Sequence, residues 1–484
     1  MSSSMAHGKG GEAGGGELGG VRRPLNVVFF GTDEFSVEHL RMLHDNSTMH
    51  VRAPRDALIG DIVVYCKGQR SHNRKMVPCA VKQFCQERGI PHTELVERDG
   101  GLREAWRKPR PLANGQPRFD VGVVVSFGLM VPKRTIEYFL DPSENDGARR
   151  GILNVHPSLL PVYRGANPIA HTIINDDPVT GVTVQRLSPG AFDAGQIIEQ
   201  VPVRVPPMAT LDSLTELLAR RGATVLQAVL RNWNAKWDGA YDQLAVKGAP
   251  AAPKLSQLMF QVDWTALTAH DVHLRHRALR YLVTQFGGKR VKLLKLVPED
   301  VPRPDISQMS LDTRMPPVPG SYVYRKGGEA MYIMCADGNW VGVKSLCFEA
   351  KRPVGAKDFM NSQAPRIQTL RVLTSMPTSL RPDNEELGKT NGGDNPLPEG
   401  SWGDTSDEAA SNDPNPAPTH PSGQPLTTGN VDPKVLELFY RVKREREARL
   451  AAEQDPTETG VKEEASSTGP TGIHRAPARL RRAN

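Results

Sequence analysis

The chain has 484 residues and a net charge of +7, and its hydrophobic fraction of 38% is low beside its 40 prolines and 44 glycines. This combination favours two folded domains joined to unstructured segments, because a wholly folded chain of this length would be more apolar. The lack of an apolar run of about 18 residues argues against a transmembrane helix and a membrane partner. Five cysteines without a C-x-x-C pair argue against a zinc site or a disulfide framework.

A strand–turn–helix unit follows a leader rich in glycine and serine. Residues 1–23 are expected to be disordered, and the acidic Glu12 and Glu17 are unusual for a mitochondrial transit peptide. Residues 25–30 (LNVVFF) are typical of a buried strand, and Asp33 can cap the helix that follows. A doubly wound α/β sheet begins in this way, although the G-x-G-x-x-G dinucleotide signature is absent.

Two loops after predicted strands are candidate binding segments. The strand over 61–65 leads into the basic loop KGQRSHNRK at 67–75, which is either an ordinary solvated loop or a contact for an anionic partner. The strand over 119–125 leads into the turn SFGLMVP at 126–132, which by itself predicts only the entry to another helix.

The candidate chemistry is concentrated in the middle of the chain. Residues 152–155 form an apolar strand, and Asn154 and His156 leave it on the same face because they are two apart. A second strand over 181–187 precedes Asp193, which can meet His156 if the two strands are neighbours. An amide, an imidazole and a carboxylate around one point suit attack of an amine on an acyl carbon, with oxyanion stabilisation and proton transfer. Each residue alone is more often a turn former than a catalyst.

The second half of the chain predicts a different architecture. A helix over 210–233 closes the first domain, and short strands joined by glycine turns beyond residue 254 are typical of a small β-barrel. The tail is polar and of low complexity, with one helix candidate over 431–453. We therefore expect a disordered leader (1–23), a catalytic domain (24–235), a linker (236–253), a C-terminal β-barrel domain (254–370) and a mostly disordered tail (371–484).

Several motifs together carry a family resemblance. N-V-H-P-S-L-L-P at 154–161, R-G-A at 164–166, D-A-G at 193–195 and F-x-G-T-x-x-F at 29–35 resemble the formyltransferase family that uses 10-formyltetrahydrofolate, and within it the enzymes that act on methionyl-tRNA. The resemblance extends over about residues 24–370. It implies a Rossmann-like catalytic domain, a small open β-barrel that helps to hold tRNA, and no metal.

The resemblance assigns roles to individual residues. It implies that Asn154, His156 and Asp193 are catalytic. The family's folate contacts correspond here to Ser158, Leu159, Leu160 and Pro161, and to Phe127, Gly128 and Leu129 in the aromatic–glycine–apolar turn. In the family a basic loop at the position of 67–75 reaches the acceptor end of the tRNA, which implies tRNA contacts for Arg70, Arg74 and Lys75, although this loop is shorter and matches the family poorly.

The implied reaction is transfer of the formyl group of 10-formyltetrahydrofolate to the α-amino group of initiator methionyl-tRNA, in support of translation initiation. Two other kinds of enzyme share the catalytic domain: a formyltransferase for glycinamide ribonucleotide or a sugar nucleotide, and a formyltetrahydrofolate hydrolase. The barrel argues against both, because a small substrate does not need it. A non-catalytic protein that binds tRNA or folate is a third alternative, against which the intact Asn154, His156 and Asp193 argue.

The cellular setting follows indirectly. The long low-complexity tail favours a eukaryotic chain. Formylation of the initiator belongs to organelles in eukaryotes, so the resemblance implies the mitochondrial matrix. We expect the protein to be a monomer.

Overall fold

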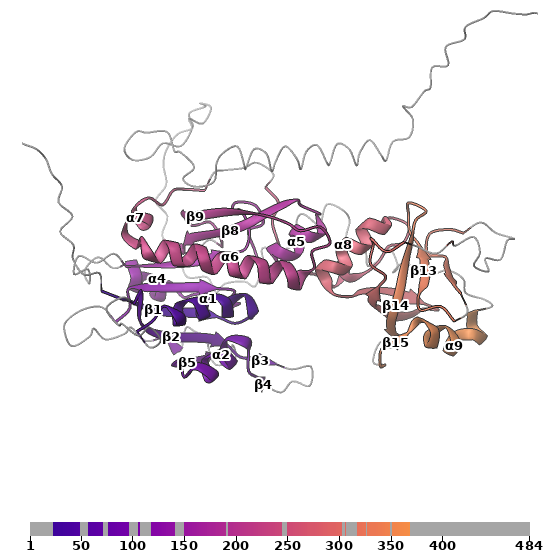
Figure 1. Ribbon diagram of the computed structural model, residues 1–484, viewed down its shortest axis with the longest axis horizontal. Coiled ribbons are helices and arrows are strands. Elements are labelled where there is room, and N and C mark those ends of the chain that lie inside the picture. Colours follow the sequence, from indigo (N-terminus) through magenta and orange to yellow (C-terminus); the bar gives the residue numbers. More distant parts are fainter. Residues whose placement is uncertain are drawn as a thin grey trace, which may run out of the picture. The chain divides into compact units, whose positions relative to one another are not determined.

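A seven-stranded mixed sheet and a six-stranded antiparallel sheet follow one another along the chain (Figure 1). The predicted tail at 371–484, its helix candidate at 431–453 and all of the leader except residue 23 lie outside the described residues. The computed structural model describes residues 23–48, 57–70, 76–95, 105–106, 118–140, 150–189, 192–243, 249–302, 305, 317–325, 327–348 and 351–367.

The first sheet is parallel over most of its width. The five strands from β5 to β7 are parallel, as predicted for a doubly wound α/β sheet, whereas β8 and β9 are antiparallel to their neighbours. The strand β9 lies at the edge of the sheet, where Pro202 needs no ladder partner for its missing N–H. In spatial order the strands are β5 (His92–Leu95), β2 (Ile59–Lys67), β1 (Leu25–Gly31), β6 (Val121–Val125), β7 (Gly151–His156), β8 (Val179–Arg186) and β9 (Ile197–Arg204).

Helices cover both faces of this sheet because alternate residues of the central strands enter two separate cores. Val27 and Phe29 pack in the core that includes the helices α1 (Glu34–Asp45), α2 (Ala80–Arg88) and α6 (Leu211–Arg231). Val28 and Phe30 pack in the core that includes α4 (Lys133–Leu140). Figure 1 shows α1 and α6 running side by side on one face. The predicted α/β class is therefore confirmed.

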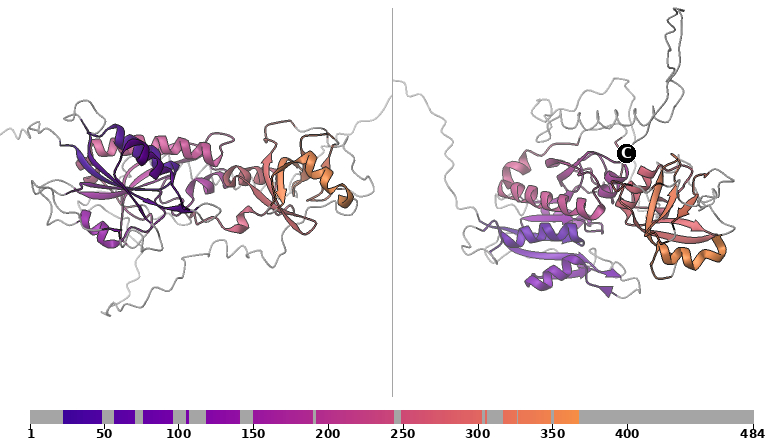
Figure 2. Two further views of the ribbon diagram at one scale, coloured as in Figure 1. Left: turned by 90° about the horizontal axis from the view of Figure 1, so that it is seen from below. Right: turned by 45° about the vertical axis from the view of Figure 1, so that its right-hand side comes forward.

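The second sheet is antiparallel and strongly curled. Its two end strands are β10 and β12, yet the rings of Phe286 in β10 and Tyr322 in β12 lie 5.8 Å apart. Among the described strands no pairing joins β10 to β12, so the barrel-like sheet stays open. The ring centroid of Phe359, in the helix α9 (Ala356–Ile367), lies 5.3 Å from that of Phe286, so α9 packs against the curved sheet. Figure 2 shows α9 beside the sheet. The strands are β10 (Leu282–Phe286), β11 (Lys289–Leu296), β12 (Tyr322–Tyr324), β13 (Met331–Met334), β14 (Trp340–Phe348) and β15 (Val354–Gly355).

A histidine between two carboxylates lies at the start of α8 (Ala269–Leu279), the helix that packs against α5 (Pro168–Ile174). The Nε2 atom of His270 lies 3.2 Å from Asp176, and its Nδ1 atom lies 2.7 Å from Glu299. The hydrogen bond to Asp176 and then the contacts with Glu299 raise the pKa of His270 from 6.5 to about 9, against the opposing effect of partial burial.

From the contacts of His270 with Asp176 and Glu299 we expect the folded protein to lose stability in mildly alkaline solution. Because the folded pKa of His270 lies above the unfolded one, its stabilisation is complete below about pH 6.5 and disappears as the pH rises through about 9. Solvent screening of this partly exposed group should keep the effect to about 1–3 °C in Tm. Thermal denaturation across this range should show a flatter pH dependence for His270→Gln than for the wild type. The control is His92→Gln, because the hydrogen bond given for His92 among the described residues is to a backbone oxygen. If the Tm of His270→Gln changes with pH as steeply as that of the wild type, the contacts of His270 with Asp176 and Glu299 are not the source of the pH dependence.

Candidate active site

The strand β7 presents its two faces to different surroundings. Leu153 and Val155 enter the core beneath α1 and α6, whereas Ile152, on the opposite face, enters the core beneath α4. Asn154 and His156 continue the face of Ile152, as their spacing predicts. The hydrogen bonds of these two side chains go to residues in loops, Asp193 for Asn154 and Tyr163 for His156.

The loop between β8 and β9 folds back over the sheet and brings Asp193 to Asn154. Because β7 and β8 are neighbours, Asn154 lies opposite Gln185, and both side-chain amides donate to Asp193 Oδ1 at 3.1 Å. The Gly165 N–H donates to Asp193 Oδ2 at 3.0 Å. His156 Nδ1 lies 3.5 Å from Asp193 Oδ1, and the two side chains are only 6% and 14% exposed. The predicted meeting of Asn154, His156 and Asp193 is therefore confirmed as geometry.

A backbone carbonyl fixes the orientation of the imidazole. His156 Nε2 lies 2.9 Å from the Tyr163 carbonyl oxygen, which can only accept a hydrogen bond. In the neutral ring, the hydrogen must therefore sit on Nε2, and Nδ1 is the ring nitrogen on the side of Asp193. This arrangement lets Nδ1 take up a proton from a reacting group and return it as a donor.

The carbonyl that orients His156 is itself held from several sides. Tyr163 is buried with a left-handed φ of +58°, a conformation that needs support from its surroundings. Its N–H donates to the Pro250 oxygen at 2.7 Å, and its hydroxyl contacts Asn175 Nδ2 at 2.8 Å and the Asp177 carboxylate. The histidine is therefore positioned by a loop that is hydrogen-bonded at several points as well as by β7.

The three side chains together offer the groups that acyl transfer needs. Of the two hydrogens on Asn154 Nδ2, one is directed at Asp193 within the described part of the chain, and the second can donate to a developing oxyanion. His156 Nδ1 can move a proton, and the carboxylate of Asp193 lies 3.5 Å from this nitrogen. The low exposure of the cluster strengthens each of these electrostatic interactions.

The residues predicted to contact folate after β7 lie in the protein interior. The Ser158 hydroxyl is fully buried and donates to the Val162 oxygen at 2.6 Å. Leu159 and Leu160 are 2% and 1% exposed, and Pro161 is also buried. Their side chains therefore build the loop that carries the Tyr163 carbonyl, and their predicted contact with folate stays a prediction.

The second predicted folate segment follows β6 on the neighbouring strand. Phe127 is 2% exposed and packs edge-on against Phe30 at 5.5 Å, so its ring belongs to the core. Its carbonyl oxygen accepts from Thr32 Oγ1 at 2.8 Å. Gly128 adopts a φ of +71°, and its carbonyl lies 3.4 Å from Lys67 Nζ. Leu129 packs at the edge of the same core, and the contact of this turn with folate stays a prediction.

The predicted tRNA loop is described only at its base. Arg70 lies at the end of β3 (Gln69–Arg70), which pairs with β4 (Met76–Val77) as a separate two-stranded sheet. Arg74 and Lys75 lie outside the described residues. Their tRNA contacts stay predictions.

Three groups around Asp193 did not emerge from the sequence analysis: the side chains of Gln185 and Gln243 and the N–H of Gly165. A signal for Gln185 existed, because Thr183 and Gln185 alternate with Val182 and Val184 and thus place polar groups on one face of an apolar strand. The Gly165 N–H is a backbone group, and Gln243 lies in the predicted linker, where no periodicity marks it.

Within the described residues no group of three or more His, Cys, Asp or Glu side chains is arranged to hold a metal ion, and none of the described helices has the length and apolarity needed to cross a membrane.

The fold and this site define an α/β enzyme of the acyl-transfer class with an appended antiparallel sheet. A family model described as formyl transferase matches residues 90–230, and one described as formyl transferase, C-terminal domain, matches residues 254–364. The mitochondrial methionyl-tRNA formyltransferase of Homo sapiens is 33% identical over 371 residues, which cover 72% of this chain and 84% of that protein. The methionyl-tRNA formyltransferase of Chlorobium phaeovibrioides is 30% identical over 344 residues, covering 70% and 95%. The chain belongs to the methionyl-tRNA formyltransferase family.

Among solved structures, a sugar 3N-formyl transferase in the presence of dTDP and 5-N-formyl-THF is similar at 15% identity and a TM-score of 0.40, over 68% of this chain and all of that one.

Proposed function

We propose that this protein transfers the formyl group of 10-formyltetrahydrofolate to the α-amino group of initiator methionyl-tRNA, and so supports translation initiation. The observation that carries the proposal is the cluster of Asn154, His156 and Asp193 around one point, in a chain of this family. Relatives from mammals and bacteria bear the name of this activity.

The reaction forms one C–N bond and breaks another. The neutral amine of the methionyl group attacks the formyl carbon, and the carbonyl oxygen becomes an oxyanion that Asn154 Nδ2 stabilises. His156 Nδ1, protonated by the attacking amine directly or through water, also donates to this oxygen. Collapse of the intermediate breaks the bond from carbon to N10 of the folate, and the proton moves to N10. No other reactant is required.

Asp193 has a positioning task in this mechanism. Its carboxylate accepts from Asn154 and Gln185 and so aims the Asn154 amide, and its Oδ1 lies 3.5 Å from Nδ1 of His156. The backbone carbonyl of Tyr163 holds the opposite ring nitrogen. Both supports act before the substrates bind, and such preorganisation lowers the barrier most effectively.

The substrates are proposed to approach from the loops around the cluster. We propose that the folate lies against the turn of Phe127, Gly128 and Leu129 and against the loop that Ser158, Leu159, Leu160 and Pro161 shape. We propose that the tRNA contacts Arg70, Arg74 and Lys75 near its acceptor end and rests on the curled antiparallel sheet. A catalytic domain over 24–235 and a tRNA-binding domain over 254–370 are consistent with the two family matches.

The proposed setting is the mitochondrial matrix, with the protein acting as a monomer. The support is that the relatives from Homo sapiens and Bos taurus are named as mitochondrial proteins, at 33% identity over 72% of this chain.

A comparison of acceptors tests the proposed function. Purified full-length protein is incubated with 10-formyltetrahydrofolate and either charged initiator methionyl-tRNA, free methionine, glycinamide ribonucleotide, a sugar nucleotide with a free amine, or no acceptor. We expect formyl transfer to the charged tRNA alone. Transfer to a small acceptor would favour one of the other formyltransferases, formate release without acceptor would favour the hydrolase, and folate binding without turnover would favour a non-catalytic binding protein.

A further inference from the structure

The predicted linker over 236–253 begins inside the helix α7 (Trp233–Asp238). Two later pieces of it are described, 239–243 and 249–253, and because both contact the elements around the active site we call them the strap. At one end of the strap Tyr241 forms a β-bridge with Ile197 at the start of β9. At the other end, beyond residue 249, the backbone exchanges hydrogen bonds with the loop that follows β7: Tyr163 N–H donates to Pro250, Ala252 N–H to Arg164, and Asn167 N–H to Ala252. The strap is thus bonded to the start of β9, directly after the loop that carries Asp193, and to the loop that follows β7.

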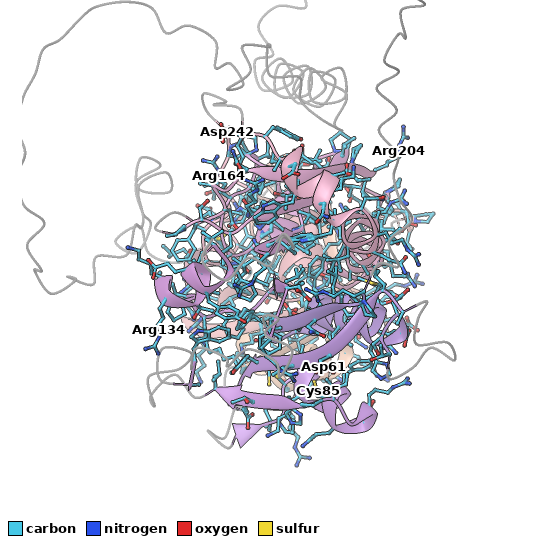
Figure 3. The ribbon with its side chains drawn as sticks, turned by 90° about the vertical axis from the view of Figure 1, so that its left-hand side faces the viewer. Asp61, Cys85, Arg134, Arg164, Arg204 and Asp242 are labelled. Carbon is cyan, nitrogen blue, oxygen red and sulfur yellow. The ribbon has the colours of Figure 1, made fainter. Side chains whose placement is uncertain are left out.

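One side chain of the strap, Gln243, contacts the backbone of the Asp193 turn and one of the donors to its carboxylate, Gln185. Its Nε2 lies 2.8 Å from the backbone oxygens of Asp193 and Gly195 and 3.1 Å from Gln185 Oε1. Its Oε1 accepts from the guanidinium of Arg164, with Nε at 3.0 Å. Figure 3 labels Arg164 and Asp242, the residue before Gln243, close together on this side of the molecule.

The partners leave only one orientation for the Gln243 amide. Its nitrogen faces three oxygens and its oxygen faces the donors of Arg164, so a flipped amide would lose every one of these bonds. Because Gln243 Nε2 holds Gln185 Oε1, the Nε2 group of Gln185 is directed at the Asp193 carboxylate. Through Arg164, the same amide also anchors the loop whose Gly165 N–H donates to Asp193 Oδ2.

The backbone of Asp193 itself needs this support. Asp193 has a left-handed φ of +49°, which a non-glycine residue keeps only where its surroundings determine it. The Gln243 amide binds the carbonyl oxygens of Asp193 and of Gly195, on the two sides of that turn. Without this bond the turn can relax and carry the carboxylate away from Asn154 and His156.

We infer that Gln243 is a positioning residue that holds the Asp193 carboxylate against Asn154 and His156 for formyl transfer. The inference rests on the proposed function, because the role of Gln243 is defined through Asp193. It assigns to the predicted linker an indirect part in the chemistry, through one amide that positions Asp193.

Gln243→Glu tests the inference with almost no change of shape. The introduced carboxylate keeps the contact with Arg164 but places an oxygen against the oxygens of Asp193, Gly195 and Gln185. We expect kcat for methionyl-tRNA to fall by about 10–100-fold, as for a displacement of about 1 Å in a catalytic group, with the KM values for folate and tRNA changed by less than about threefold. Lowering the pH protonates the introduced carboxyl and restores a donor, so the ratio of the wild-type rate to the variant rate should decrease in acid. Gln243→Ala should also have a lowered kcat, but the ratio of the wild-type rate to its rate should not depend on pH, because alanine has no carboxyl group to protonate.

Gln196→Glu is the matched control. Gln196 joins the same strap to the same loop, because its Oε1 accepts from Arg186 and its Nε2 donates to Asp242 Oδ1 at 3.0 Å, but it has no recorded bond to Asp193 among the described residues. We expect its kcat to stay within about twofold of the wild type.

Four results would contradict the inference: wild-type kcat in Gln243→Glu, a defect confined to KM, a rate ratio that does not respond to pH, or an equal loss in Gln196→Glu. Thermal denaturation of all variants separates a loss of folded protein from a loss of rate. Failure of the wild type itself to formylate methionyl-tRNA would instead contradict the proposed function.

Discussion

Asp193→Asn is expected to lower kcat for formyl transfer to methionyl-tRNA by about 10³-fold, the scale of a lost catalytic carboxylate or oxyanion donor. The two carboxylate oxygens accept three N–H donors, from Asn154, Gln185 and Gly165. An asparagine has only one acceptor oxygen, so either orientation of its amide directs N–H groups at N–H groups. The substitution also removes the negative charge 3.5 Å from His156 Nδ1.

Initial rates at saturating folate and charged tRNA measure this effect. Asp242→Asn is the control, since Asp242 lies nearby on the strap and accepts from Gln196 rather than from the catalytic cluster. We expect the control to retain wild-type activity within about twofold. A rate for Asp193→Asn close to that of the control would remove Asp193 from the mechanism.

Gly195→Ala is expected to disable the enzyme without touching a catalytic group. A Cβ atom at this position would lie 1.8 Å from the Arg186 carbonyl oxygen and 2.9 Å from its carbon. Because the obstacle is backbone of β8, the loop itself must move, at a cost of about 1–3 kcal/mol in the free energy of unfolding. That movement displaces Asp193, two residues earlier, and should lower kcat by about 10²-fold or more.

Denaturation by urea and steady-state kinetics on the same preparation measure the two effects. Gly355→Ala is the control, because a Cβ at Gly355 has no neighbour within 4 Å. The control should match the wild type in both measurements. If Gly195→Ala keeps wild-type stability and kcat, then the close approach of the loop to β8 is not required for activity.

Two residues of the cluster, Asn154 and His156, could be placed from the sequence because their placement follows from strand geometry. A spacing of two puts Asn154 and His156 on one face of a strand, and the pairing of β7 with β8 brings the next loop within reach. The position of Asp193 over Asn154 needed more than this. It depends on the loop between β8 and β9 folding back across the sheet, which no local pattern encodes.

The supports of the cluster were mostly beyond prediction for the same physical reason. The bonds of Gln243 join positions 48 to 79 residues apart in the chain, and such pairings depend on tertiary contacts rather than on periodicity. Ser158 and Leu160 were assigned to folate by resemblance, whereas their side chains lie in the interior of the loop they shape. The backbone oxygen of Tyr163 orients the imidazole of His156. Every residue type has a backbone oxygen, so the identity of residue 163 could not reveal this contact.

The double variant His156→Ala with Asp193→Ala tests most directly whether the cluster acts as one unit in formyl transfer. Single-turnover rates are measured with 10-formyltetrahydrofolate and charged initiator methionyl-tRNA for the wild type, both single variants and the double variant. Residues that serve the same step are strongly non-additive, so the double variant should be about as slow as the slower single variant. Losses that multiply, or near-normal rates in both single variants, would contradict the assignment of these residues to one catalytic unit.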